Sequence, residues 1–118
     1  MAGPQRDFSK PNSREYRTPR RKSAILLPSG NDLPTPPAPA GVVFTDSEAE
    51  SWADLWRTGE STQWSDATLT MVALLVRLMT KMYAGDATSA ELAQIDRCLV
   101  GLGLTPSSRQ RLGWEMAS

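Results

Sequence analysis

The chain has 118 residues, 40% of them hydrophobic, with 13 basic and 13 acidic side chains and a formal net charge of zero. Its length fits a single domain. The sequence contains no histidine and a single cysteine, which excludes Ser-His-Asp chemistry, imidazole metal ligands and an internal disulfide. We therefore expect no metal site and no cofactor, and enzymes are the least favoured class of function.

The net charge of zero hides a division between the two ends of the chain. Residues 1–40 carry seven basic and three acidic side chains, a net charge of +4, whereas residues 41–118 carry six basic and ten acidic ones, a net charge of −4. Basic terminal segments often bind polyanions, most commonly nucleic acid. The alternative is a solvated leader without a specific partner, and composition alone favours the two equally.

Residues 1–43 are predicted to form a basic, proline-rich arm and linker that is disordered or extended. "LPTPPAPAG" (residues 33–41) is typical of a semi-rigid spacer. The apolar "AILLP" (residues 24–28) is the exception, because it could pack on the body or on a neighbouring subunit. No apolar run follows Met1, and the stretch from Leu69 to Tyr83 is too short to span a bilayer, so we expect a soluble, cytosolic protein without a membrane partner.

Residues 44–118 are predicted to form an all-α domain, a small bundle of about four helices. "TDSE" (residues 45–48) and "TSAE" (residues 88–91) have the spacing of capping boxes, which begin helices. Residues 67–85 predict the longest and most apolar helix. In "GLGLTPSSRQRLGWEM" (residues 101–116), the order of glycine, threonine and proline predicts a joint between two helices, the second ending at Met116.

The apolar side chains of residues 67–85 and the four tryptophans exceed what three short helices are expected to cover. We therefore expect the leftover surface to contact another copy of the chain. The alternative is a well-covered monomeric bundle with this helix at its centre. The residues expected at the oligomer interface are Trp52, Trp56, Leu74, Leu75, Leu78 and Met82.

The final helix also bears on nucleic-acid binding. Gly101 and Gly103 do not form a dinucleotide fingerprint, because a helix precedes them and the third glycine is missing. A helix N-terminus beside Arg109 suits a DNA phosphate, so Arg109 is a candidate contact. For Arg111, an ion pair with Glu115, four residues further on, is the favoured interpretation.

The order of three segments resembles a known family. "ESWADLWRTGESTQW" (residues 50–64), the long apolar helix and "LGLTPSSRQRLGWE" (residues 102–115) together resemble the small terminase subunits of tailed bacteriophages, in particular the P27-like family. The resemblance covers about residues 20–116, and the closing motif is its specific part. It implies a non-catalytic subunit that forms a homo-oligomeric ring in the host cell cytoplasm. Such a ring binds double-stranded viral DNA and regulates the ATPase and nuclease of the large terminase subunit.

If the protein holds DNA, we expect the arm to contribute most of the phosphate contacts. The residues predicted to bind DNA are Arg14, Arg17, Arg20, Arg21, Lys22 and Arg109. The alternative function is a small helical scaffold or adaptor whose basic arm binds an acidic protein partner, without a role on DNA. A hydrolase built on Asp46, Glu48 and Glu50 ranks far below, because acidic residues at a helix start favourably meet the helix dipole.

Overall fold

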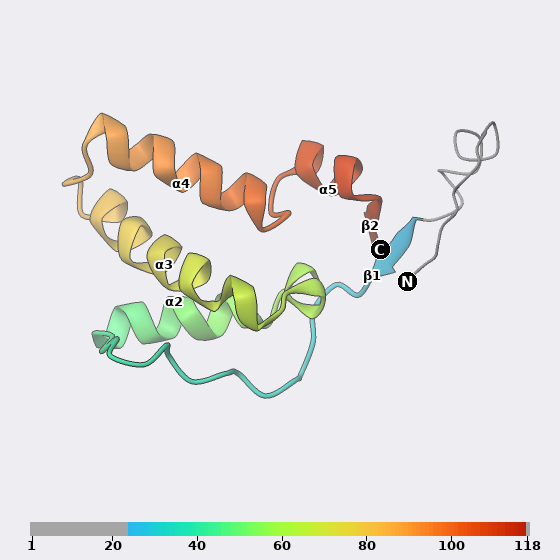
Figure 1. Ribbon diagram of the computed structural model, residues 1–118, viewed down its shortest axis with the longest axis horizontal. Coiled ribbons are helices and arrows are strands. Elements are labelled where there is room, and N and C mark those ends of the chain that lie inside the picture. Colours follow the sequence, from blue (N-terminus) through green and yellow to red (C-terminus); the bar gives the residue numbers. More distant parts are fainter. Residues whose placement is uncertain (1–23, 118) are drawn as a thin grey trace, which may run out of the picture.

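The computed structural model describes residues 24–117, and the predicted DNA-binding part of the arm lies outside them. Figure 1 shows α3 lying between α2 and α4, with α5 and two short strands at one end. The elements are β1 (Ile25–Leu27), α2 (Asp46–Trp56), the 3-10 helices η2 (Glu60–Gln63) and η3 (Asp66–Thr68), α3 (Leu69–Tyr83), α4 (Ser89–Gly101), α5 (Pro106–Leu112) and β2 (Trp114–Met116). The predicted helical class is confirmed, and the two strands are an addition to it.

Local sequence signals begin three of the four α-helices. Both predicted capping boxes form: Thr45 and Glu48 exchange hydrogen bonds of 2.9 and 3.2 Å, and Thr88 and Glu91 exchange bonds of 2.9 and 3.1 Å. Thr105 caps α5, with Pro106 in the first turn of the helix. These contacts satisfy backbone N–H groups that have no partner inside a helix.

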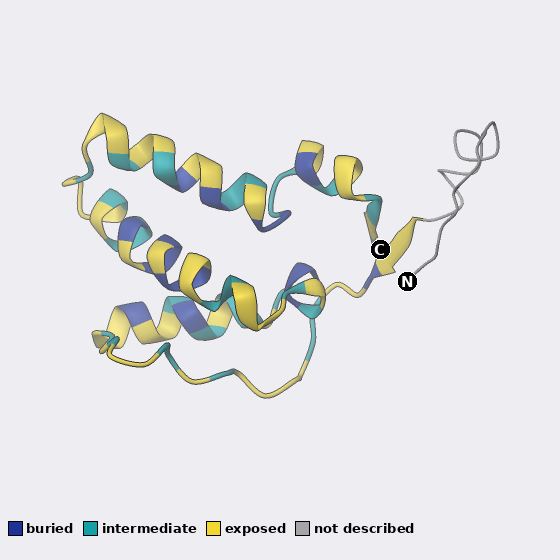
Figure 2. Cartoon of the chain, in the orientation of Figure 1, coloured by how far each residue is buried: buried dark blue, intermediate teal, exposed yellow. Residues whose placement is uncertain are grey.

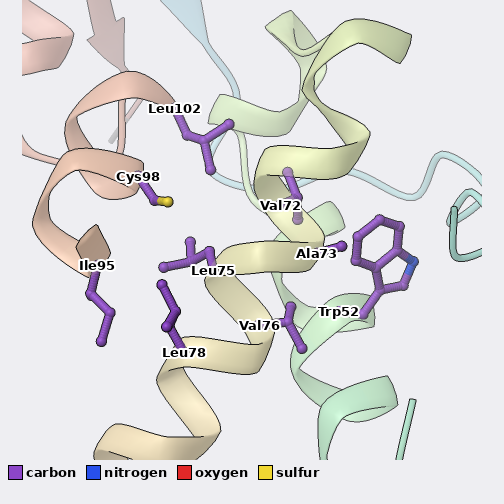
Figure 3. Packing of buried hydrophobic residues seen from close by; sticks show 9 residues of the cluster. All are labelled: Trp52, Val72, Ala73, Leu75, Val76, Leu78, Ile95, Cys98 and Leu102. Atoms are coloured by element: carbon purple, nitrogen blue, oxygen red, sulfur yellow. The ribbon is translucent and has the colours of Figure 1, made fainter. Parts of the chain in front are cut away.

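The hydrophobic core lies where α3 faces α2 and α4. In Figure 3, Trp52 of α2 lies on one side of α3, while Ile95 and Cys98 of α4 lie on the other. Burial raises the pKa of the Cys98 thiol, so Cys98 packs as a small neutral side chain, as predicted. The complete buried cluster is Trp52, Val72, Ala73, Leu75, Val76, Leu78, Ile95, Cys98 and Leu102.

One protomer covers most of the apolar surface of α3. Figure 2 shows buried positions facing both neighbouring helices. The large apolar side chains of α3 that remain exposed are Met71 (38%), Leu74 (42%) and Tyr83 (74%), the last residue of the helix. The expectation that this helix is too apolar for its own chain to cover is therefore wrong for most of its surface. The physical reason is that α2 and α4 occupy opposite sides of α3, as in the alternative of a covered bundle.

Residues 24–44, here called the strap, lie against the helical body. The apolar "AILLP" segment supplies β1, which pairs in parallel with β2 in the register Ile25↔Trp114 and Leu27↔Met116. Further along, the Trp52 indole N–H donates to the carbonyl of Pro36 at 2.8 Å. Near its other end, Arg77 donates to the carbonyl of Val43 at 2.8 Å. The described part of the segment predicted as a linker is therefore attached to the body at several points.

The last helix is shorter than predicted. It ends at Leu112, and Gly113 follows in the left-handed conformation with φ of 78°. Glycine adopts this conformation without the steric cost of a Cβ atom and is the usual residue at such an ending. The prediction that the helix continues to Met116 is therefore wrong, because residues 114–116 form β2 instead.

Candidate nucleic-acid interface

The basic leader (residues 1–22) lies outside the described residues, and the part of the chain nearest to it that the structure describes is the start of β1. The backbone N–H of Ile25 donates to the carbonyl of Gly113 at 2.7 Å, and that of Ala117 donates to the carbonyl of Leu27 at 2.8 Å. The first bond attaches the start of β1 to the point where α5 ends and β2 begins, and the second joins the ends of the two strands (Figure 1). The start of β1 therefore lies beside the C-terminal end of α5.

Arg109, the candidate DNA contact on α5, is engaged within the protein. Its Nη1 atom lies 2.9 Å from Oε2 of Glu60, and the two side chains are 23% and 10% exposed. This pair joins α5 to η2 across 49 positions of sequence. The assignment of Arg109 as a DNA contact stays a prediction, and the structure adds that its charge is already paired with a carboxylate that only the fold brings close.

Arg111 does not form the ion pair that the sequence predicts for it. It is exposed, and no carboxylate of residues 24–117 lies within ion-pair distance of it. The expected pair with Glu115 requires a continuous helix, and the left-handed turn at Gly113 removes that geometry.

Most other basic side chains of the body are also neutralised. The remaining ion pairs are Arg57–Asp54 at 3.0 Å, Arg77–Glu48 at 3.1 Å and Lys81–Glu91 at 2.6 Å. Arg97 donates a hydrogen bond to the neutral side chain of Gln94. Within residues 24–117, Arg97 and Arg111 are therefore the two cations without a carboxylate partner.

The residues predicted for an oligomer interface differ in how far one protomer buries them. Trp52, Leu75 and Leu78 are buried in the core of one protomer, so their assignment to an interface between copies is corrected. Trp56 and Met82 are partly buried and pack against that core. Leu74 is the one member of the predicted set that is counted as exposed.

A shallow cavity of about 220 Å³ lies between the strap and the two 3-10 helices, lined in part by Leu33, Pro34, Trp56 and Trp64. The Trp56 indole N–H is buried without a hydrogen-bond partner. Residues 24–117 hold no cluster of three potential metal ligands, and no helix in this range is long and apolar enough to cross a membrane.

Comparisons of the chain with protein-family models, with curated proteins and with solved structures find no match. The functional argument therefore depends on the residues of this chain and on their arrangement.

Proposed function

We propose that the protein is a non-catalytic, DNA-binding subunit of a viral genome-packaging assembly, of the small terminase class. In this proposal, copies associate into a ring, the basic leader binds double-stranded viral DNA, and the assembly regulates the large terminase subunit in the host cell cytoplasm. The segments around Trp52 and Trp114 that resemble small terminase subunits are the reason for choosing this class.

The distribution of charge along the chain is the observation that supports DNA binding most directly. Four of the six basic side chains in the body are held in ion pairs. The leader carries seven basic and two acidic residues, a net charge of +5, while residues 23–118 carry six basic and eleven acidic ones, a net charge of −5. Phosphate contacts are therefore expected at the leader, where the basic residues outnumber the acidic ones.

The same division of charge supports association between copies. A contact between the leader of one protomer and the acidic body of the next joins two different surfaces, and such head-to-tail contacts form rings when the rotation closes. The exposed Leu74 and Met71 on α3 offer an additional apolar contact. Native mass spectrometry is expected to show multiples of the protomer mass, and a monomer at micromolar concentration would contradict the ring.

A salt titration of DNA affinity tests the function. If Arg14, Arg17, Arg20, Arg21 and Lys22 each neutralise one phosphate, the logarithm of the affinity for duplex DNA is expected to fall with the logarithm of salt concentration with a slope of about −4.5. Replacing all five with alanine is expected to abolish most of this slope. Unchanged binding by that variant would refute the assignment to the leader.

The adaptor alternative makes the opposite prediction. If the leader binds an acidic protein, the chain is expected to bind an acidic polypeptide such as polyglutamate but no duplex DNA at any salt concentration. That result would replace the packaging proposal with the adaptor.

A further inference from the structure

We infer that the strap is exchanged between copies of the chain, so that residues 24–39 of one protomer lie on the body of the next. The structure describes the closed form, in which β1 pairs with β2 of the same chain and Trp52 bonds to Pro36 of the same chain. In the exchanged form, a second copy supplies β1 and Pro36 at these two places. The inference rests on the proposed association of copies, and it identifies the contact that joins them.

The strap is held by bonds to the body rather than by bonds within itself. The side-chain amide of Asn31 donates to the backbone carbonyls of Trp56 and Thr58 at 3.1 and 2.7 Å. Among the described hydrogen bonds, the one that joins two residues of the range 24–39 runs from the Leu33 N–H to the Asn31 side chain at 2.9 Å. Because the partners of the strap lie on the body, the same surface of a second copy offers the same contacts, and exchange loses none of them.

A turn at residues 39–42 connects the exchanged part of the strap to the rest of the chain and serves as the hinge. The Val42 N–H donates to the Pro39 carbonyl at 3.0 Å, and Gly41 has φ of 84°. Nothing lies within 4 Å of a Cβ atom built on Gly41, so the turn borders open space there. Glycine adopts extended conformations as readily as this one. Opening the turn therefore gives up one backbone hydrogen bond and meets no steric obstacle at Gly41.

The apolar side chains that one protomer leaves exposed gather on the strap. Ile25, Leu26 and Leu33 are 42%, 68% and 62% exposed, and Val43, just after the hinge, is 83% exposed. Four of the nine large exposed apolar side chains in the described part of the chain therefore lie in the strap. A hinge of three residues spans at most about 10 Å, so exchange brings two bodies together at this surface. Apolar surface of this kind is what a second copy covers.

A second copy of the chain is the occupant that the surface under the strap fits. The Trp52 indole N–H donates to the carbonyl of Pro36 at 2.8 Å, and Trp56 and Trp64 line the hollow beside the strap. Aromatic surfaces bind extended proline-rich segments, whose carbonyls have no internal hydrogen bonds. The strap of a second copy has the same sequence and therefore fits the same surface. The chain's own strap has the higher effective concentration in dilute solution, so exchange is favoured where copies are concentrated, as in an assembly.

Cross-linking between two different variants tests the exchange. Leu26 and Glu115 are register partners on β1 and β2, and both side chains are exposed. Chains with Leu26→Cys and chains with Glu115→Cys are mixed in urea, refolded together and treated with a short bis-maleimide, while Cys98 stays buried in the core. Full exchange is expected to link about half of the Leu26→Cys chains to Glu115→Cys chains, because random mixing gives each strap an equal chance of either neighbour.

Two controls establish what a link means. A chain that carries both Leu26→Cys and Glu115→Cys, treated in dilute solution, is expected to link within itself, which shows that the reagent spans the pair. Ala93→Cys replaces Glu115→Cys in the matched control, because Ala93 is exposed but lies near the start of α4, at the end of the bundle opposite to the strands (Figure 1). It is expected to give no link to Leu26→Cys chains.

The length of the hinge provides a second measurement. Deleting Ala40 and Gly41 removes the turn that returns the strap to its own body, so the exchanged form is expected to gain at the expense of the closed one. Native mass spectrometry is expected to show fewer single protomers for this variant than for the unaltered protein at equal concentration. A folded variant that stays monomeric would overturn the exchange, and if the deletion prevents folding, the cross-linking of the chains with an intact hinge decides.

The outcomes separate the inference from the proposed function. If the unaltered protein forms multiples of the protomer mass but links between chains are no more frequent than with Ala93→Cys, the exchange is overturned and the ring stands. A monomer at every concentration would contradict both the ring and the exchange. Links between chains in a protein that binds no duplex DNA would support the exchange and contradict the proposed function.

Discussion

Gly103 is the position where a single added methyl group tests the docking of the last strand. It follows α4 with φ of +74°, and a Cβ atom built there lies 2.1 Å from Cζ3 of Trp114. Trp114 is the first residue of β2, so its ring and Gly103 hold the strand pair against the helical body. Gly103→Ala is therefore expected to disturb both the turn after α4 and the packing of the Trp114 ring.

The magnitude follows from two separate costs. A non-glycine residue in the left-handed region costs about 1–2 kcal/mol, reduced by about 0.4–1 kcal/mol because alanine restricts the unfolded chain. Moving the Trp114 ring to relieve the contact adds about 1–3 kcal/mol, as for other overpacked interiors. Gly103→Ala is thus expected to lower the free energy of unfolding by about 2–4 kcal/mol.

Gly85→Ala isolates the first of these costs. Gly85 has φ of +80°, and nothing lies within 4 Å of a Cβ atom built on it. We expect Gly85→Ala to lower the free energy of unfolding by about 1 kcal/mol, or about 4–8 °C in melting temperature for a domain of this size. Urea unfolding followed by circular dichroism measures both variants, and equal destabilisation would refute the packing of Trp114 on Gly103.

Three further substitutions test the contacts that join the segments of the body. Arg109→Ala leaves the carboxylate of Glu60 largely buried without its partner and is expected to cost about 3 kcal/mol in urea unfolding, whereas adding Glu60→Gln should recover part of that loss. Trp52→Phe removes the 2.8 Å hydrogen bond to the strap and is expected to cost about 1 kcal/mol, with faster amide exchange in residues 33–39 as the sign of a loosened strap. The hydrogen bond from Lys81 lowers the pKa of Glu91 below its ordinary value of 4.5. The pair therefore stabilises the folded state above pH 4.5, and this stabilisation is lost as the pH falls below that value. In Glu91→Gln, the melting temperature is expected to fall less than in the unaltered protein when the pH is lowered through this range. An equal fall in melting temperature in both proteins would show that the pair of Lys81 and Glu91 contributes nothing to stability.

The sequence alone determined the local features of this protein. The capping boxes at Thr45 and Thr88 and the Thr105–Pro106 start of the last helix form where the sequence predicts them, because each depends on residues at most three positions apart. The division of charge between leader and body is likewise a property of composition. These features require no knowledge of which elements meet.

Only the tertiary structure decided what meets across long stretches of chain. The pair of Arg109 with Glu60, the parallel pairing of residues 25–27 with residues 114–116, and the covering of α3 by its own neighbours all join segments that are separate in sequence. Local spacing carries no information about such contacts, since loop closure and packing select them from many compatible partners. For that reason the sequence predicted an ion pair for Arg111 and none for Arg109, whereas among residues 24–117 the fold pairs Arg109 with Glu60 and gives Arg111 no carboxylate partner.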